Sequence, residues 1–169
     1  MNHLDQIETE RMVGIRVAMD LWNDWVTLES EPKFLEILET PYDEAKSLER
    51  LRHNVDLWSE HGHGQWLFFQ KETKAIVGRS GIRYMQVNQV WEYELGYWIL
   101  PPYWRKGFGF EMAHKSLEIA KSLGIESVVA FALTENVKSI GLMQKLGFQY
   151  ETEITHADRP HVLYRKQLK

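Results

Sequence analysis

The stretch that decides the fold runs from Trp98 to Ala113 and reads WILPPYWRKGFGFEMA. It opens with the apolar and aromatic residues that strands favour, and a pair of prolines then interrupts it. Gly107 and Gly109 follow, and glycine lets the backbone approach a ligand closely because it has no side chain. Ala113 and Leu117 then recur at a helical spacing. The stretch predicts a strand, an irregular loop and a helix that begins near residue 108.

The start of this helix lacks a side chain that could satisfy its own backbone. No Ser, Thr, Asp or Asn stands at the expected cap position, so the first N–H groups need another partner. An anion such as a pyrophosphate fits, because Arg105 and Lys106 reinforce the positive end of the helix dipole. The alternative is a glycine-containing turn whose helix end is hydrated. The stretch is neither a Walker loop, which ends in Gly-Lys-Ser/Thr, nor a dinucleotide fingerprint, which needs a third glycine.

The elements on either side follow from the spacing of apolar residues and the positions of turn residues. Strands are expected over residues 66–70, 75–85, 90–100, 126–133, 148–155 and 161–166, and helices over residues 108–124 and 137–146. The first third is expected to be helical, with Asp20 capping a helix that ends near Pro32 and Thr40 capping the next one. Strands that alternate with helices in the second half predict a mixed sheet covered by helices.

Composition narrows the class of protein. The 169 residues, without an internal repeat or a low-complexity linker, fit a single domain over residues 1–169. The absence of cysteine excludes disulfides, cysteine-bound zinc and a cysteinyl intermediate, and it suits a reducing compartment. The formal net charge of -4 gives no reason to expect nucleic acid as a partner. The first residues are polar and no apolar run reaches the length of a membrane helix, so we expect a cytoplasmic protein without a membrane partner.

Four segments in register carry a resemblance to a known family. They are ELGYWI at residues 94–99, YWRKGFGFE at residues 103–111, NVKS at residues 136–139 and KLGF at residues 145–148. Together with TERM at residues 9–12, followed by Ile15 and Arg16, where the family has its first strand, they resemble the GNAT family of N-acetyltransferases. The resemblance is strongest to the RimJ/RimL-like branch, which acetylates ribosomal-protein amino termini. It implies an α/β (α+β) fold with a mixed, mostly antiparallel sheet of six to seven strands flanked by about four helices.

The resemblance also implies acetyl-CoA as the cosubstrate, an amine as the acceptor and no metal ion. The positions that match the family's coenzyme site are Trp98, Ile99, Leu100, Arg105, Lys106, Gly107, Phe108, Gly109, Phe110 and Asn136. Residues 105–110 would cradle the pyrophosphate with backbone amides, while residues 98–100 would leave the neighbouring strand and pair with the pantetheine arm. Trp98 matches the residue whose amide N–H faces the thioester carbonyl, where it favours the developing charge. Asn136 would bond the CoA arm and also cap the helix that follows it.

Two positions depart from the family's pattern. Trp104 stands where the cradle commonly begins with Gln or Arg, although Trp is frequent there in the amino-terminal-acetylating branch. Met143 stands where many members carry the tyrosine that protonates the leaving thiolate, and a thioether cannot donate a proton. Ser139 lies one helical turn earlier on the same face, where that branch uses a serine. We therefore expect Ser139 to be the general acid.

The reaction also needs a group that takes a proton from the amine, because an alkylamine is mostly protonated at neutral pH. Without cysteine, the simplest mechanism is direct attack of the amine on the thioester in a ternary complex. Glu94 is the best candidate base, because it lies four residues before Trp98 and so faces the same side of the strand. The alternative is that Glu94 forms an ion pair with Arg79 or Arg83. Glu92 is a second candidate base.

The function expected from these features is N-acetylation of a primary amine, either a peptide amino terminus or a small amine. Two alternatives stay open: an antibiotic- or polyamine-acetylating enzyme of the same fold, and a CoA-binding regulatory module without turnover. His156 and His161 flank a turn near the acceptor end of this fold, so either could touch the acceptor. The fold often pairs through edge strands, which makes a homodimer one expected state.

Overall fold

An eight-stranded sheet runs through the computed structural model, which describes residues 3–169. The strand order is β1-β2-β3-β4-β5-β6-β8-β7, and β5 and β6 are the parallel neighbours in an otherwise antiparallel sheet. The strands are β1 (Gln6–Glu8), β2 (Met12–Arg16), β3 (Gln65–Gln70), β4 (Ile76–Val87), β5 (Val90–Ile99), β6 (Ser127–Leu133), β7 (Gln149–His156) and β8 (Arg159–Gln167). The α-helices are α1 (Trp22–Glu29), α2 (Pro32–Leu38), α3 (Glu44–His61), α4 (Phe108–Ser122) and α5 (Val137–Lys145).

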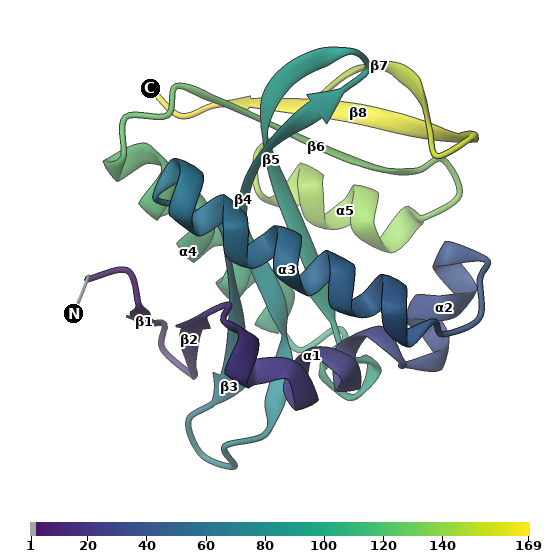
Figure 1. The fold of residues 1–169 in the computed structure, drawn as a ribbon. Helices are drawn as coiled ribbons and strands as arrows, with labels where there is room; N and C mark the ends of the chain where they lie inside the picture. The colour runs from purple at the N-terminus through teal and green to yellow at the C-terminus, as the bar shows by residue number, and fades with distance from the viewer. Residues whose placement is uncertain (1–2) are drawn as a thin grey trace.

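Helices cover both faces of the sheet, because side chains alternate between the two faces of each strand. Ile82 of β4, Leu95 of β5 and Ala130 of β6 pack with residues of α4 and α5 in one buried cluster. On the opposite face, Leu67 of β3 packs with apolar residues of α1 and α3. Figure 1 shows α3 crossing in front of the sheet and α4 behind it. We call these faces the α4 face and the α3 face. Within the described part of the chain, no helix is long and apolar enough to cross a membrane.

The elements expected from residue 65 onward are confirmed, with every end placed to within two residues. The mixed, mostly antiparallel sheet is also confirmed. Within residues 3–169 it has eight strands instead of six or seven, because residues 6–16 form a hairpin of two short strands. The same range contains five α-helices instead of about four.

The additional helix begins at a proline that the sequence pattern assigns to a helix end. Pro32 is the first residue of α2, a position where its missing N–H breaks no helical hydrogen bond. Glu31 caps this helix, since its carboxylate accepts from the N–H groups of Lys33 and Phe34 at 2.7 and 3.1 Å. The chain therefore turns at Ser30 and Glu31 into a second short helix.

Two predicted helix caps are wrong. Asp20 lies within a 3-10 turn, Met19–Leu21, and α1 starts without a side-chain cap. Thr40 does not open α3, which begins three residues after Pro41, at Glu44. Its cap is Asp43, whose Oδ1 accepts from the N–H of Lys46 at 3.0 Å.

The first hairpin is tied to the start of α4 by Glu111. The Glu111 carboxylate accepts from the Thr9 hydroxyl at 2.6 Å and from the backbone N–H and Nε of Arg11, both at 2.8 Å. Burial alone would raise the pKa of Glu111, but these hydrogen bonds outweigh it and lower the pKa. Glu111 stands in the first turn of α4. The hairpin therefore fixes the position of the loop that precedes this helix.

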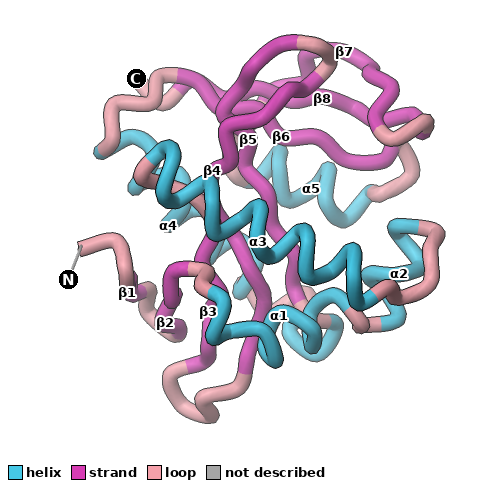
Figure 2. The backbone as a smooth tube through the Cα atoms, in the orientation of Figure 1, coloured by secondary structure: helices cyan, strands magenta, loops and turns pink. Residues whose placement is uncertain are grey.

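The weak join in the sheet lies between β5 and β6. β4 and β5 pair from Gly78 and Ile99 along to the turn of their hairpin. Among residues 3–169, by contrast, β5 and β6 are joined at a single position, Glu94 with Val129. Figure 2 shows the two strands running apart from there. We call this separation, along residues 96–99 of β5, the splay.

Candidate active site

The start of α4 has the geometry that its sequence predicts. Gly107 is the N-cap residue with a φ of 81°, and no side chain caps the helix. Arg105, in the same loop, also has a positive φ of 59°. Such angles are uncommon for residues that carry a side chain. The first N–H groups of α4 are thus left without a side-chain partner, as an anion site requires.

Arg11 supports this loop from the side of the first hairpin. Its Nη1 donates to the carbonyl of Lys106 at 2.9 Å, and its guanidinium lies 3.9 Å from the centre of the Phe108 ring. A hollow of about 540 Å³ lies here, lined by the hairpin turn and by Gly107 and Phe110 among others. Sequence reasoning missed Arg11, because its place beside the loop depends on how the first hairpin folds back onto α4.

The end of β5 presents its backbone groups alternately to its two sides. The N–H of Leu100 donates to a carbonyl of β4 at 2.9 Å, while the carbonyl of Ile99 accepts from Trp104 Nε1 at 2.7 Å. By this alternation the amide of Trp98, like that of Leu100, is directed toward β4. The amides of Tyr97 and Ile99 are directed toward the splay. The N–H groups that open toward the splay therefore belong to Tyr97 and Ile99, and not to Trp98, the residue expected from the sequence to present its amide there.

The side chain of Trp98 lies on the α3 face. Its ring centre is 5.0 Å from that of Phe34 on α2 and 6.3 Å from that of Trp104. The indole N–H is buried and finds no hydrogen-bond partner among residues 3–169. Buried donors are normally bonded. An acceptor atom of a bound ligand would satisfy this one.

The start of α5 brings Ser139 against β5. Asn136 caps this helix as its sequence predicts, with Oδ1 accepting from the N–H of Ser139 at 3.2 Å. Ser139 Oγ lies 2.8 Å from the hydroxyl oxygen of Tyr97, which is also 3.1 Å from the Ser139 carbonyl oxygen. Met143, one turn later, is fully buried. Sequence reasoning missed Tyr97, although alternation along β5 already sets it on the face opposite Trp98.

Burial raises the pKa of Tyr97 to about 12, because it outweighs the hydrogen bond to Ser139, which lowers the pKa, while the negative charge of Glu94 adds a smaller upward contribution. The phenol therefore keeps its proton at neutral pH. Tyr97 enters the site as a neutral hydrogen-bond donor.

The carboxylate of Glu94 is buried and paired with Arg83. It accepts from Arg83 Nε at 2.8 Å and from Nη2 at 3.0 Å, and Glu94 is 3% exposed. Of the two ion pairs considered from the sequence, the one with Arg83 is present, whereas Arg79 bonds another carboxylate at 3.0 Å. Glu92 is held by Arg165 at 2.7 Å. Each oxygen of Glu94 keeps a second lone pair for a water molecule or an amine.

Two histidines lie on the α3 face close to Glu94. The ring centre of His156 is 4.6 Å from that of Phe131 and 5.4 Å from that of His161. The pKa of His156 is lowered, mainly by burial and also by the neighbouring His161, although the negative charge of Glu94 acts in the opposite direction. Nδ1 of His161 donates to the carbonyl of Arg159 at 2.9 Å, which leaves Nε2 as an acceptor in the neutral ring. Both rings therefore lie beside Phe131 of β6, on the same face of the sheet as Glu94.

Arg159 links the β7–β8 turn to the end of α2. It begins β8, just after the turn from β7, and donates to the carbonyl of Ile37 at the end of α2. Its Nη2 also donates to the Glu39 carboxylate at 3.0 Å. Arg159 therefore joins α2 to the β7–β8 turn.

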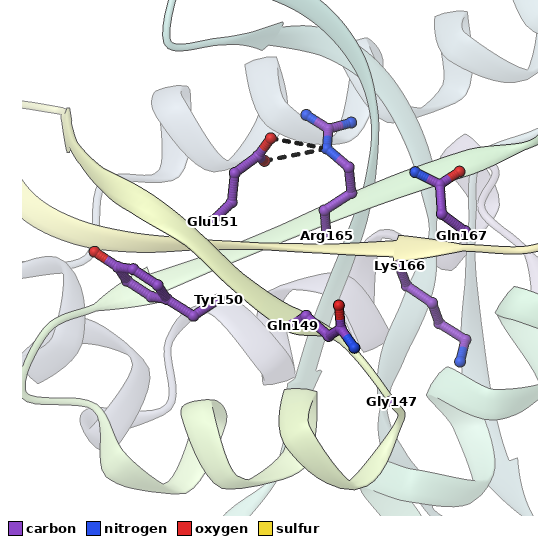
Figure 3. Close-up of a pocket in the computed structure, with 7 residues that line it drawn as sticks. All are labelled: Gly147, Gln149, Tyr150, Glu151, Arg165, Lys166 and Gln167. Carbon is purple, nitrogen blue, oxygen red and sulfur yellow. Dashed lines mark hydrogen bonds and ion pairs between the residues drawn. The ribbon is translucent and has the colours of Figure 1, made fainter.

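A separate hollow of about 450 Å³ lies on β7 and β8 (Figure 3). The guanidinium of Arg165, which lines this hollow, is already paired with carboxylates. Its Nε donates to both oxygens of Glu151 at 3.1 Å, and its Nη2 donates to Glu92 at 2.7 Å. None of the site residues expected from the sequence lines it. This hollow is therefore distinct from the loop before α4.

Comparisons with known proteins identify the family. A family model described as an acetyltransferase (GNAT) domain matches residues 15–149. YoaA of Bacillus subtilis, an uncharacterised N-acetyltransferase, is 32% identical over 96 residues, which cover 56% of this chain and 54% of the relative. The match thus spans about half the length of that relative.

Solved structures share the whole fold. An acetyltransferase from Agrobacterium tumefaciens superposes with a TM-score of 0.82 at 22% identity, over 95% of this chain and 93% of that one. RimL, a ribosomal-protein α-N-acetyltransferase, superposes with a TM-score of 0.79 at 14% identity, over 96% and 93%. At such identities the likeness establishes the fold alone. The family model spans most of the chain, and the protein therefore belongs to the GNAT family of acetyltransferases.

Proposed function

We propose that the protein transfers the acetyl group of acetyl-CoA to the nitrogen of an amine within a ternary complex. The observation that carries the proposal is the uncapped start of α4 next to the splay of β5 and β6. A diphosphate would satisfy the free N–H groups of the helix, and an extended arm would run along the unpaired end of β5.

The coenzyme would use backbone groups more than side chains. Residues 105–110 would hold the pyrophosphate, with the charges of Arg105 and Lys106 nearby. The Ile99 amide, directed toward the splay, would donate to the pantetheine arm as it passes Leu100. Asn136 uses Oδ1 to cap α5, so its NH₂ group is left to donate to the same arm.

In the proposed reaction the amine nitrogen attacks the thioester carbonyl, a C–N bond forms and the C–S bond breaks. Counted from the neutral amine, the nitrogen loses one proton and the sulfur gains one; an amine that binds in its protonated form would also release its extra proton to solvent by way of Glu94. An amide of β5 beside Trp98 would hold the developing oxyanion, and the Ser139 hydroxyl would donate to the departing sulfur. Glu94 would accept the amine proton, directly or through a water molecule, from its place on the same strand.

Replacing Glu94 with glutamine (E94Q) is expected to lower kcat by about 10-fold or more, since a positioned base contributes on the order of 100-fold or more. The affinity for CoA should change little, because Glu94 lies away from the loop before α4. Steady-state kinetics with a saturating amine and calorimetric titration with CoA measure the two quantities.

Glu92→Gln (E92Q) is the matched control for this prediction. Glu92 faces the same side of β5 one pleat away and is bound to Arg165 much as Glu94 is bound to Arg83. A loss of kcat in E92Q but not in E94Q would assign the base to Glu92, the second candidate, instead. Equal losses of kcat and melting temperature in the two variants would mean that Glu94 is structural.

The proposed function is tested by thiol release. Purified protein is mixed with acetyl-CoA and with peptides that carry free amino termini, polyamines and small alkylamines, and the free thiol is measured over time. Amine-dependent release with acetylated product supports the proposal. Tight CoA binding without release for any amine would favour a regulatory module instead.

A small amine is the second candidate acceptor, and the Arg159 bridge favours it. The hydrogen bonds of Arg159 to Ile37 and Glu39 hold α2 against the β7–β8 turn. A long peptide would find its path between these two elements closed, whereas a small amine would not need that path. The same assay separates the two acceptors, because turnover with alkylamines or polyamines but with none of the peptides would identify the small-amine enzyme.

A further inference from the structure

Tyr97 and Ser139 share a pair of hydrogen bonds between β5 and α5. The two hydroxyl oxygens are 2.8 Å apart, and the Tyr97 hydroxyl is 3.1 Å from the carbonyl oxygen of Ser139. The backbone of Ser139 is fixed as well, because its N–H bonds to Asn136 Oδ1 at 3.2 Å. Tyr97 thus holds the residue that the proposed reaction uses at the leaving sulfur.

The two hydroxyl groups carry one proton each, which allows two arrangements. If the phenol donates to the Ser139 carbonyl, the serine hydroxyl donates to the phenol oxygen and is not available to donate to a ligand. If the phenol donates to Ser139 Oγ, which is the shorter separation, the serine proton is free to leave the pair. A hydroxyl that accepts one hydrogen bond also donates a stronger one, because bonds in a chain polarise one another.

We propose that Tyr97 is a positioning residue of the acetyl transfer: its hydroxyl donates to Ser139 Oγ and so directs the Ser139 O–H toward the departing sulfur. This inference rests on the proposed function. Tyr97 acts through Ser139 and does not itself touch the thioester. When the C–S bond breaks, its electron pair remains on sulfur, and the Ser139 O–H stabilises that charge.

The residues around Ser139 explain why its hydrogen-bond donor is Tyr97 of β5 and not a residue of α5. Met143, one turn after Ser139 on α5, is fully buried and has no proton to give. Tyr97 stands on the α4 face of β5, where its hydroxyl contacts Ser139 in the first turn of α5, while Trp98 faces the opposite side. Because burial keeps the phenol protonated at neutral pH, the donor is present throughout the range in which the amine can react.

A kinetic double-mutant cycle tests this. We expect Ser139→Ala (S139A) to lower kcat by about 100-fold, the lower end of the contribution of a positioned proton donor. Tyr97→Phe (Y97F) should lower kcat by about 10-fold, because Tyr97 acts only through Ser139. If Tyr97 acts only through Ser139, the double variant should be no slower than S139A, because interacting sites are not additive. The KM for acetyl-CoA should stay within about twofold in all three, since the coenzyme cradle is untouched.

Tyr93→Phe (Y93F) is the matched control. Tyr93 lies on the same strand and the same face, four residues earlier, and its loss of a hydroxyl should leave kcat within about twofold. Thermal melting of Y97F checks that the ring still fills its place. An unchanged kcat in Y97F, or a double variant slower by the product of the single effects, would overturn the role of Tyr97 while the proposed function stands. A wild-type protein that releases no thiol with any amine would overturn both.

Discussion

Replacing Gly107 with valine (G107V) is expected to weaken CoA binding on the order of 100-fold, equivalent to one or two lost charge-assisted hydrogen bonds. Gly107 has a φ of 81°, which a β-branched residue adopts only under strain. A Cβ at this position would lie 3.2 Å from Arg11 Nη2. Valine would therefore displace the loop and turn the first N–H groups of α4 away from the pyrophosphate. Isothermal titration with CoA measures the effect.

Gly124→Val (G124V) separates the loss of a binding site from the loss of a glycine. Gly124 follows the other end of α4 and has the same φ of 81°, with nothing within 4 Å of an added Cβ. Both variants should lose on the order of 1 to 3 kcal/mol of stability from backbone strain. G107V alone should lose the coenzyme. Equal CoA affinity in the two variants would contradict the assignment of the loop as the pyrophosphate site.

Replacing Glu29 with alanine (E29A) is expected to cost about 3 to 5 kcal/mol of unfolding free energy, the usual cost of leaving a buried charge without its partner. The Glu29 carboxylate is fully buried and accepts from Arg50 Nη2 at 2.6 Å, Ser47 Oγ at 2.8 Å and Arg79 Nη1 at 3.0 Å. The Arg79 side chain is 12% exposed and lies 4.3 Å from the ring centre of Trp25. Without Glu29, this guanidinium stays buried and unpaired. Urea unfolding monitored by tryptophan fluorescence measures the loss.

Glu36→Ala (E36A) provides the comparison on the neighbouring helix. Glu36 pairs with Lys33 at 2.9 Å, but both side chains are more than half exposed. Such a surface pair contributes at most about 1 kcal/mol. A loss in E29A that is no larger than in E36A would mean that the buried pair contributes nothing and that α1 packs without it.

The same carboxylate predicts how stability depends on acid. Burial alone would raise the pKa of Glu29, but the hydrogen bonds from Arg50 and Ser47 and the charge of Arg79 outweigh it, so the pKa is lowered. A group whose pKa is lowered by folding stabilises the native state above its unfolded pKa, and that contribution is lost as the pH falls through the folded pKa. The wild type should therefore lose stability more steeply below about pH 4 than Glu29→Gln (E29Q) does. Parallel curves would contradict the shift.

The second half of the fold could be read from the sequence because its signals are local. The strands from residue 65 onward alternate or carry β-branched runs, and Gly147 follows the end of α5 as a helix stop should. The first third could not, since Pro32 is compatible with a helix end and with a helix start. The outcome there depends on a carboxylate, Glu31, that reaches two backbone N–H groups.

The candidate site divides in the same way. The bare start of α4 and the cap at Asn136 follow from which residues are absent or present at one position. Tyr97 and Arg11 could not be found by that route, because each acts across a distance in sequence of 42 and 95 residues respectively. The partner of Glu94 could be predicted in part. Its strand and face were predictable, and the choice of Arg83 over Arg79 needed the register of β4 against β5.

The single pairing of β5 with β6 makes the sheet nearly discontinuous in the middle. Strands β1 to β5 form one antiparallel unit and β6 to β8 another, and both units pack against α4 and α5 in one hydrophobic cluster. A pantetheine arm bound along β5 would contact both units and so stabilise the boundary between them. At 100 times its Kd, a ligand adds about 2.7 kcal/mol to the native state. The supply of coenzyme would then set how long the enzyme survives proteases, as well as how fast it works.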